Sequence, residues 1–274
     1  MPDTHLTSKT DSLRNAASRL RSRAAFIAVA ALLAAALTSC ASDKDNASRG
    51  AAPVDLTSLV ASTTETKLPR APKDTDPLAA TDGEVVHPRR TLPVYAAPDR
   101  RPFAKVAPKQ MMNDTWLPVL DQRGAWTQVL LPSRPNGSTG WLRTAQLDRR
   151  RSPYLIKVHV GSRQLELLRD GAEVGSWSVA VGAPETPTPV GRTFLLASIV
   201  DAGQSYSPLI LPLGSHSDTL DSYGGGPGTV ALHGWPDASV FGSAVSHGCV
   251  RVPADALEQL RQVPLGTLVI VDQQ

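Results

Sequence analysis

Several features that define common protein classes are scarce in this sequence. Its 274 residues include two cysteines, Cys40 and Cys249, so a small disulfide-bonded scaffold is excluded. The apolar run at residues 24–37 has fourteen positions without a charge, which is short for a membrane-spanning helix of about 20 residues. Aromatic residues make up 5% of the chain and are not interleaved with basic ones, so we expect no nucleic-acid partner.

The first 39 residues have the layout of an export signal. Residues 14–23 contain four arginines and no acidic residue, and the apolar run follows directly. A basic segment before an apolar stretch of this length is typical of a secretory signal peptide. A buried core helix is the alternative, but it needs apolar neighbours that this end of the chain does not offer.

The export signal ends in Leu-Thr-Ser-Cys at residues 37–40, which resembles the lipobox of bacterial lipoproteins. The resemblance implies that Cys40 is acylated on sulfur and becomes the mature N-terminus. We therefore expect an extracytoplasmic protein, anchored by lipid to the outer face of the cell membrane and facing the cell wall. Cleavage nearby, with Cys40 left as a free thiol, is the alternative.

The net charge of +3 belongs entirely to the predicted signal peptide, which holds five basic and two acidic residues. The rest of the chain is neutral but unevenly charged. Residues 40–84 carry −3, residues 85–151 carry +8 and residues 152–274 carry −5. The basic middle segment is either a solvated face with a charged linker at residues 149–151, or a surface that attracts anionic wall polymers or lipid head groups.

Composition divides the remaining chain into a tether and two β-rich domains. Residues 40–84 have no aromatic residue and no apolar period, which predicts a disordered tether. Residues 85–151 alternate short apolar runs with turn signals such as Asn136-Gly137, which predicts a small β-barrel. Strands are expected at residues 92–95, 116–120, 126–131 and 141–142. The stretch from Trp116 to Leu147 resembles bacterial SH3-like domains.

Residues 152–274 again read mainly as strands. We expect them at residues 154–160, 164–168, 176–181, 193–200, 229–233 and 267–271, with a hairpin turn at residues 169–172. One short helix is expected over residues 254–262, because Pro253 stands where a first helical turn tolerates proline. The predicted fold class is therefore mainly β, with one short helix in the larger domain.

One cysteine and two histidines form the constellation most suited to chemistry. Cys249 lies in Ser-His-Gly-Cys-Val-Arg at residues 246–251, and His233 ends an apolar strand. A thiol nucleophile needs a base or an imidazolium nearby to lower its pKa from about 8.5. His247 and His233 are both candidates for that role. Gly248 frees the backbone beside the sulfur, so main-chain N–H groups could form an oxyanion hole.

Two other interpretations of these residues stay open at this point. His216, His233, His247 and Cys249 could supply four zinc ligands, although their spacing matches no common zinc signature. Alternatively, the cysteine packs as a small apolar side chain and the histidines are structural.

The spacing of His233 and the motif at residues 246–251 resembles the signature of the L,D-transpeptidase (YkuD-like) catalytic domain. The similarity extends to Ala-Val-Gly at 180–182, Thr-Pro-Thr-Pro-Val-Gly-Arg at 186–192, and the segments 214–217, 224–228 and 263–269. It covers residues 154–271 and implies a YkuD-like β-sandwich. Many members have Asn where this chain has Arg251, which puts the role of that residue in doubt.

The resemblance implies a role for each member of the motif. Cys249 attacks the peptide bond between the third and fourth residues of a peptidoglycan stem, releasing D-Ala and forming a thioester. His233 acts as base and then as acid, with its other ring nitrogen held by a backbone carbonyl near Gly234. His247 supports the site, and N–H groups near Gly248 and Cys249 hold the oxyanion. An amine of a second stem then resolves the thioester.

The resemblance implies no metal and no organic cofactor, and it makes Cys249 a target for carbapenems. Around the nucleophile, we expect Ser246 to shape the turn through a local hydrogen bond. Gly234 and His216 are candidates for the substrate channel, although His216 could equally be a loop histidine. Arg251 is expected either to contact a carboxylate of the stem peptide or to form a structural ion pair.

The leading functional hypothesis is a monomeric, lipid-anchored L,D-transpeptidase that acts on peptidoglycan stem peptides. An L,D-carboxypeptidase would have the same site with water as the acceptor. A non-catalytic wall-binding lipoprotein is the alternative from another class, with the basic barrel as its working part.

Overall fold

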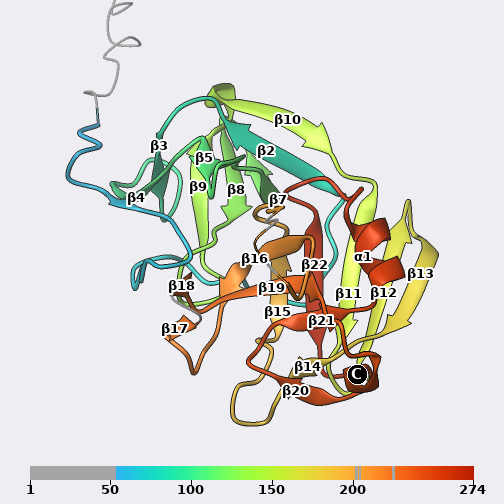
Figure 1. Cartoon of the computed structure of the whole chain (residues 1–274). Helices are drawn as coiled ribbons and strands as arrows, with labels where there is room; N and C mark the ends of the chain where they lie inside the picture. The colour runs from blue at the N-terminus through green and yellow to red at the C-terminus, as the bar shows by residue number, and fades with distance from the viewer. Residues whose placement is uncertain (1–53, 201–202, 204, 224–225) are drawn as a thin grey trace, which may run out of the picture. The chain divides into compact units, whose positions relative to one another are not determined.

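The computed structural model describes residues 54–200, 203, 205–223 and 226–274. The predicted signal peptide, Cys40 and the start of the predicted tether lie outside the described residues. Within them the protein is mainly β, with one α-helix, α1 (Ala254–Leu260), as the sequence predicted (Figure 1). In this described part of the chain, no helix has the length and apolar character needed to cross a membrane.

The N-terminal part is built on one sheet of eight strands, in the order β1-β4-β3-β9-β8-β7-β2-β10. Their bounds are β1 (Val60–Ala61), β4 (Pro102–Val106), β3 (Leu92–Tyr95), β9 (Thr139–Arg143), β8 (Trp126–Leu130), β7 (Leu117–Arg123), β2 (Glu84–Pro88) and β10 (Leu147–Arg151). Neighbouring strands are antiparallel except β1 and β4. The strands predicted in this region are confirmed, with ends shifted by up to three residues.

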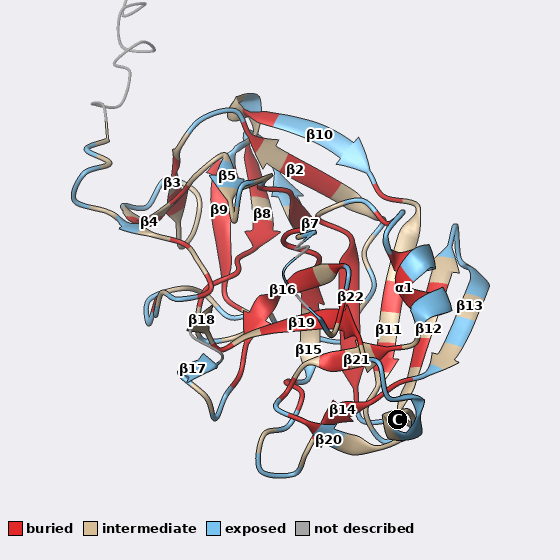
Figure 2. Cartoon of the chain, viewed as in Figure 1, coloured by how far each residue is buried: buried red, intermediate tan, exposed pale blue. Residues whose placement is uncertain are grey.

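The C-terminal part contains two further sheets that share one core. The five-stranded sheet has the order β13 (Ala172–Ser178), β12 (Gln164–Arg169), β11 (Tyr154–His159), β22 (Leu268–Asp272) and β15 (Gly191–Phe194). The three-stranded sheet has the order β16 (Ile210–His216), β19 (Thr229–Gly234) and β21 (Val250–Val252). Side chains from both sheets and from α1 join a single buried cluster. Figure 2 colours the buried residues along these elements red.

Smaller elements complete the described part of the chain. Paired short strands are β5 (Lys109–Gln110) with β6 (Asn113–Asp114), β14 (Val181–Gly182) with β20 (Ala244–Ser246), and β17 (Ser222–Tyr223) with β18 (Gly226–Pro227). Two 3-10 turns cover Thr144–Gln146 and Ala238–Val240. The strand predicted at residues 193–200 is shorter than expected: β15 ends at Phe194, and the residues after it form only isolated bridges at Leu195 and Ile199.

The domain boundary predicted at residue 151 does not separate two independent hydrophobic cores. Phe194 and Leu196 come from the C-terminal part, yet they pack in the apolar cluster of the eight-stranded sheet. Gly214 makes room for this arrangement, because a Cβ there would lie 2.3 Å from the Phe194 ring. The described residues from 54 onward accordingly form one compact unit.

The prediction of a disordered tether is wrong for residues 54–84. This segment contributes β1 to the sheet edge and buries Leu68 in the N-terminal core. Asp74 then forms a bidentate ion pair with Arg192 of β15, with distances of 2.5 and 2.6 Å. Composition indicated disorder because the segment has no apolar period of its own. It is ordered by contacts with residues that are distant in sequence.

The prediction of a charged linker at residues 149–151 is also wrong. These arginines are in β10, which pairs with β2 along its whole length. Arg149 forms an ion pair with Glu84, Arg150 stacks over Trp116, and Arg151 lies 3.3 Å from a carboxylate oxygen of Asp170. Seven of the twelve basic residues in 85–151 form ion pairs, three of them with acids outside that segment. The four inner acids are already counted in the net charge of +8, so the three outer acids lower it to +5 and the segment keeps a net positive charge.

Candidate active site

A cavity of about 440 Å³ opens where β19 and β21 meet. Its lining combines the predicted catalytic residues with several aromatic ones: Tyr206, Ile210, Tyr223, Pro227, Thr229, Ala231, His233, Trp235, Ser246, His247, Cys249 and Arg251. Five of the predicted site residues, namely His233, Ser246, His247, Cys249 and Arg251, therefore share one cavity. The sequence did not predict the aromatic lining residues Tyr206, Tyr223 and Trp235, although Trp235 lies only two residues after His233. It also did not predict Ser207, which contacts Gly234 behind the cavity lining.

The strand β19 places His233 at the cavity. Its run Thr-Val-Ala-Leu-His is almost entirely buried, because β19 is the central strand between β16 and β21. The register of the parallel pair sets His233 beside Arg251, two residues after Cys249. A buried strand of this kind is rigid, so it fixes the backbone on which the histidine is mounted.

One ring nitrogen of His233 is committed to the backbone. Its Nδ1 lies 2.8 Å from the carbonyl oxygen of Gly234, and only the tautomer with Nδ1 protonated can donate to that acceptor. Nε2 is then the nitrogen with a free lone pair. Burial lowers the pKa of His233, the Gly234 hydrogen bond opposes that shift, and the charge of Arg251 reinforces it. The imidazole is therefore neutral near pH 7 and suited to accept a proton.

Gly234 is fixed in turn by Ser207. The hydroxyl of Ser207 accepts the Gly234 N–H at 2.8 Å and donates to the carbonyl of Leu209 at 2.5 Å. A Cβ at Gly234 would lie 3.1 Å from the Ser207 hydroxyl oxygen. The predicted role of Gly234 in the substrate channel is therefore better described as support for His233.

The thiol of Cys249 is half-buried and free. Burial raises the pKa of the thiol, while a hydrogen bond with the Ala231 backbone and the positive charge of Arg251 lower it. The burial effect is the largest, so the resting sulfur carries its proton. The protonated thiol shares the cavity with the neutral imidazole of His233, and it needs a general base at the moment of attack.

The turn before Cys249 is held by hydrogen bonds from two sides. The Ser246 hydroxyl donates to the Cys249 carbonyl and accepts the Gly248 N–H at 3.1 Å, which agrees with the predicted turn-shaping role. Thr186 and Thr188 donate to the carbonyls of Ser246 and Gly248, both at 3.0 Å. The two threonines of the Thr-Pro-Thr stretch therefore stabilise the turn that carries Cys249.

The predicted contribution of the Gly248 N–H to an oxyanion hole is not supported. That N–H already donates to the Ser246 hydroxyl. Glycine is needed at position 248 for its backbone conformation, because a φ of +110° lies in a region that residues with a Cβ rarely adopt.

Arg251 faces the cavity without a carboxylate partner. Its guanidinium lies 3.6 Å from the centroid of the Trp235 ring. Among the described residues it forms no ion pair within 4.0 Å, and its buried Nε has no hydrogen-bond partner. The alternative of a structural ion pair is therefore contradicted. A partly buried guanidinium that faces a cavity, with no carboxylate partner among the described residues, is suited to bind a carboxylate.

His247 lies at the exposed rim of the cavity. Its ring stacks on Tyr223, with centroids 4.7 Å apart and planes at 29°. In this position it contacts the aromatic wall of the cavity, whereas His233 is the histidine held in a single tautomer.

The structure does not place His216 in the cavity. It is 1% exposed, at the end of β16, and its Nδ1 lies 2.7 Å from the Ser217 carbonyl oxygen. The backbone of His216 pairs with Asn136 of the N-terminal part. Its predicted role in the channel is wrong, because His216 is not among the residues that line the cavity. The zinc alternative fails with it, since no three His, Cys, Asp or Glu residues in the described segments are grouped as metal ligands.

Comparison with known proteins relates the segment that contains this site to a protein family. The YkuD model, described as the L,D-transpeptidase catalytic domain, matches residues 153–271. The YkuD proteins of Bacillus subtilis and Bacillus licheniformis, both named as L,D-transpeptidases, are 29% and 32% identical over 122 and 120 residues. These matches cover 44% and 43% of this chain, and 67% and 66% of the relatives. An L,D-transpeptidase structure from Mycobacterium tuberculosis is 18% identical, covering 50% of this chain and 73% of that chain with a TM-score of 0.38. The family match supports a YkuD-like L,D-transpeptidase catalytic domain over residues 153–271.

Proposed function

We propose that the protein is a peptidoglycan L,D-transpeptidase that works through a thioester on Cys249. The observation that carries this proposal is one cavity that holds a free thiol, a neutral imidazole of fixed tautomer and an unpaired guanidinium. The match of residues 153–271 to the L,D-transpeptidase catalytic domain supports the same reaction class.

In the first half-reaction, Nε2 of His233 takes the proton of the Cys249 thiol. The sulfur attacks the carbonyl carbon between the third and fourth stem residues, and the carbonyl electrons move to oxygen. The resulting imidazolium then gives its proton to the nitrogen of the departing D-Ala as the C–N bond breaks. The Gly234 carbonyl favours this role, because it accepts from Nδ1–H and stabilises the imidazolium.

In the second half-reaction, the amine of another stem attacks the thioester carbonyl. His233 takes a proton from that amine as the new C–N bond forms, and the C–S bond breaks. The proton returns to sulfur, so that thiol and imidazole regain their starting states. The balance is one amide bond broken, one formed and one D-Ala released.

Two further groups complete the proposed site. The N–H of Cys249 is the donor that we assign to the oxyanion, because the N–H of Gly248 is already used by Ser246. Arg251 is assigned to a carboxylate of the donor stem. The central carbon of its guanidinium lies 3.6 Å from the centroid of the Trp235 ring, and this contact limits the side-chain entropy lost on binding.

Incubation of the purified chain with tetrapeptide muropeptides tests this proposal directly. We expect dimers cross-linked between two third-position residues, together with free D-Ala, detected by chromatography and mass spectrometry. Tripeptides without dimers would instead identify water as the acceptor and the protein as an L,D-carboxypeptidase. No conversion of the tetrapeptide would exclude both enzymes.

We also propose that the protein is exported and anchored to the membrane through Cys40. This proposal depends on the sequence of residues 14–40, an arginine-rich segment, an apolar run and a lipobox-like end. Growth of cells with an alkyne-tagged fatty acid should label the wild-type chain and Cys249→Ala, and should fail to label Cys40→Ala. Equal labelling of all three chains would contradict the anchor.

A further inference from the structure

One wall of the catalytic cavity comes from the segment between β16 and β19, residues 217–228, which we call the wall loop. Its residues 224–225 are not described. The loop leaves and rejoins the sheet at one point, where the Ser217 N–H donates to the Gly228 carbonyl at 2.7 Å. Tyr223 and Pro227 of this loop line the cavity, so the position of its base determines the shape of that wall.

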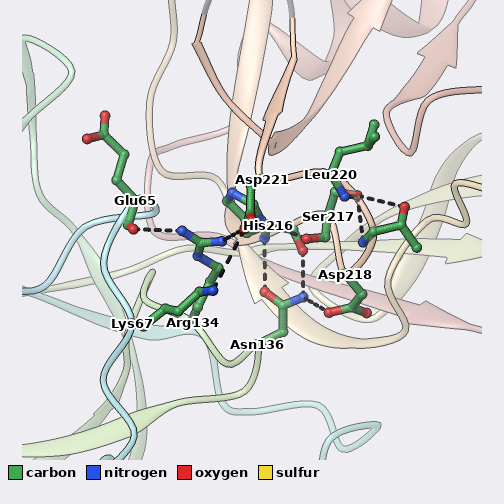
Figure 3. A network of polar contacts seen from close by, with 10 residues as sticks. Glu65, Lys67, Arg134, Asn136, His216, Ser217, Asp218, Leu220 and Asp221 are labelled. Atoms are coloured by element: carbon green, nitrogen blue, oxygen red, sulfur yellow. Dashed lines mark hydrogen bonds and ion pairs between the residues drawn. The ribbon is translucent and has the colours of Figure 1, made fainter.

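A single side chain of the N-terminal part holds the start of the wall loop (Figure 3). The Asn136 Oδ1 accepts the His216 N–H at 2.9 Å, and its Nδ2 donates to the His216 carbonyl at 2.7 Å. The same Nδ2 lies 3.2 Å from a carboxylate oxygen of Asp218. The amide thus replaces the backbone of a neighbouring strand, which requires a donor and an acceptor in one side chain.

A second contact fixes the loop further along. Arg134 donates to the carboxylate of Asp221 at 2.5 Å and to the carbonyl of Glu65 at 2.9 Å, and the Arg134 side chain is 19% exposed (Figure 3). The ammonium of Lys67 lies 3.9 Å from the same Asp221 oxygen. The Arg134 hydrogen bond and then the charge of Lys67 lower the pKa of Asp221, so this carboxylate stays ionised and paired.

The far end of the wall loop is held in the same way. Thr229, the first residue after it, bonds through its hydroxyl to the hydroxyl of Thr64 at 2.8 Å. Both ends of the loop are thus attached to residues that precede the catalytic domain in the sequence. Tyr223 of the wall loop stacks on His247, so the loop is in direct contact with the motif that contains Cys249.

We propose that Asn136 and Arg134 are positioning residues of the active site, which hold the wall loop and thereby set the affinity for the donor peptide. This inference rests on the proposed transpeptidase function. Neither residue is among those that line the cavity, so both act through the loop. The N-terminal part would then be an integral part of the enzyme rather than a spacer.

The variant Asn136→Asp in the full chain tests this inference. Asp keeps the shape and the acceptor but loses the donor, and it places a second carboxylate beside Asp218. With a tetrapeptide muropeptide as the donor, we expect KM to rise by at least about tenfold, because both hydrogen bonds that Nδ2 donates are lost, with kcat changed by less than about twofold. Arg134→Gln should shift KM in the same direction, and Arg134→Lys should restore part of the loss because lysine retains the charge near Asp221.

A matched control separates positioning from general damage. Asn113 lies in the same part of the chain, but its Nδ2 donates to Met111 within the β5–β6 hairpin. The variant Asn113→Asp should leave KM unchanged. Hydrogen exchange gives a second readout: peptides covering residues 217–228 should exchange faster in Asn136→Asp than in the wild type, and no faster in the control.

The outcomes distinguish this inference from the proposed function. If the wild type turns over the muropeptide and Asn136→Asp has the same KM, the inference is overturned while the function stands. If the wild type shows no turnover, the proposed function and the link to substrate affinity both fail. In that case faster exchange in residues 217–228 still supports the anchoring of the loop, and unchanged exchange overturns that as well.

Discussion

A chain carrying Cys249→Ala converts no tetrapeptide muropeptide, with turnover reduced by at least about 10⁴-fold. The sulfur is the only atom in the proposed mechanism that bonds covalently to the substrate, so no neighbour can replace it. Removal of the sulfur from a half-buried position should leave the fold and any binding to isolated cell walls intact. The measurement is muropeptide turnover in detergent, compared with a wall-pelleting assay on the same protein.

The matched control is the other cysteine, Cys40→Ala, which should retain turnover of soluble muropeptides. Mass spectrometry adds a second test of the nucleophile, because a carbapenem should leave an adduct on the peptide that contains Cys249. Full activity of Cys249→Ala would remove the thioester from the mechanism and favour the non-catalytic, wall-binding alternative. A wild-type chain with no carbapenem adduct would count against the assigned nucleophile.

The variant Asp74→Ala is expected to lower the free energy of unfolding by about 3–5 kcal/mol, because it leaves a buried guanidinium without its carboxylate. The side chains of Asp74 and Arg192 are 3% and 8% exposed, and their two hydrogen bonds are short. The pair joins the segment 54–84 to β15 of the catalytic domain. Its loss should therefore destabilise the compact unit as a whole.

Urea denaturation measures this effect, with Asp148→Ala as the control. Asp148 also pairs with an arginine, Arg89, but both side chains are more than half exposed. A solvent-exposed pair contributes little, so the control should unfold at nearly the wild-type urea concentration. Equal midpoints for Asp74→Ala and the wild type would show that residues 54–84 add nothing to stability, as a tether would.

The elements that the sequence predicted well are those in which local pattern and tertiary environment agree. The turn at Asp170-Gly171 has positive φ at both residues, as an Asp-Gly hairpin requires, and β12 and β13 flank it. Helix α1 follows Pro253 and buries one face through Ala256, Leu257 and Leu260. In both cases the residues that decide the structure are neighbours in the sequence.

The wrong predictions concern residues whose structure is decided by partners distant in the sequence. Nothing local in residues 54–84 indicates that Leu68 enters a core or that Asp74 meets Arg192. The core that Leu68 joins is built from strands that follow this segment, and Arg192 lies 118 positions after Asp74. His216 was a candidate because it lies in the segment 214–217, which forms part of the family resemblance. In the structure its ring nitrogen Nδ1 lies against the Ser217 carbonyl oxygen, its backbone pairs with Asn136, and it is not among the residues that line the cavity.

The sequence by itself determined the mainly β architecture and the chemical set of the site: a lone thiol after a Ser-His-Gly turn, a strand-ending histidine and an arginine two residues later. Those features depend on residue type and short spacing. The tertiary structure alone decided which cavity histidine is held in one tautomer, that the Gly248 N–H is already bonded, and that Arg251 meets no acidic partner within the described part of the chain. It also decided that residues before the catalytic domain hold the wall of the cavity. Hydrogen bonds and burial between distant residues cause these properties, and no local pattern in the sequence encodes them.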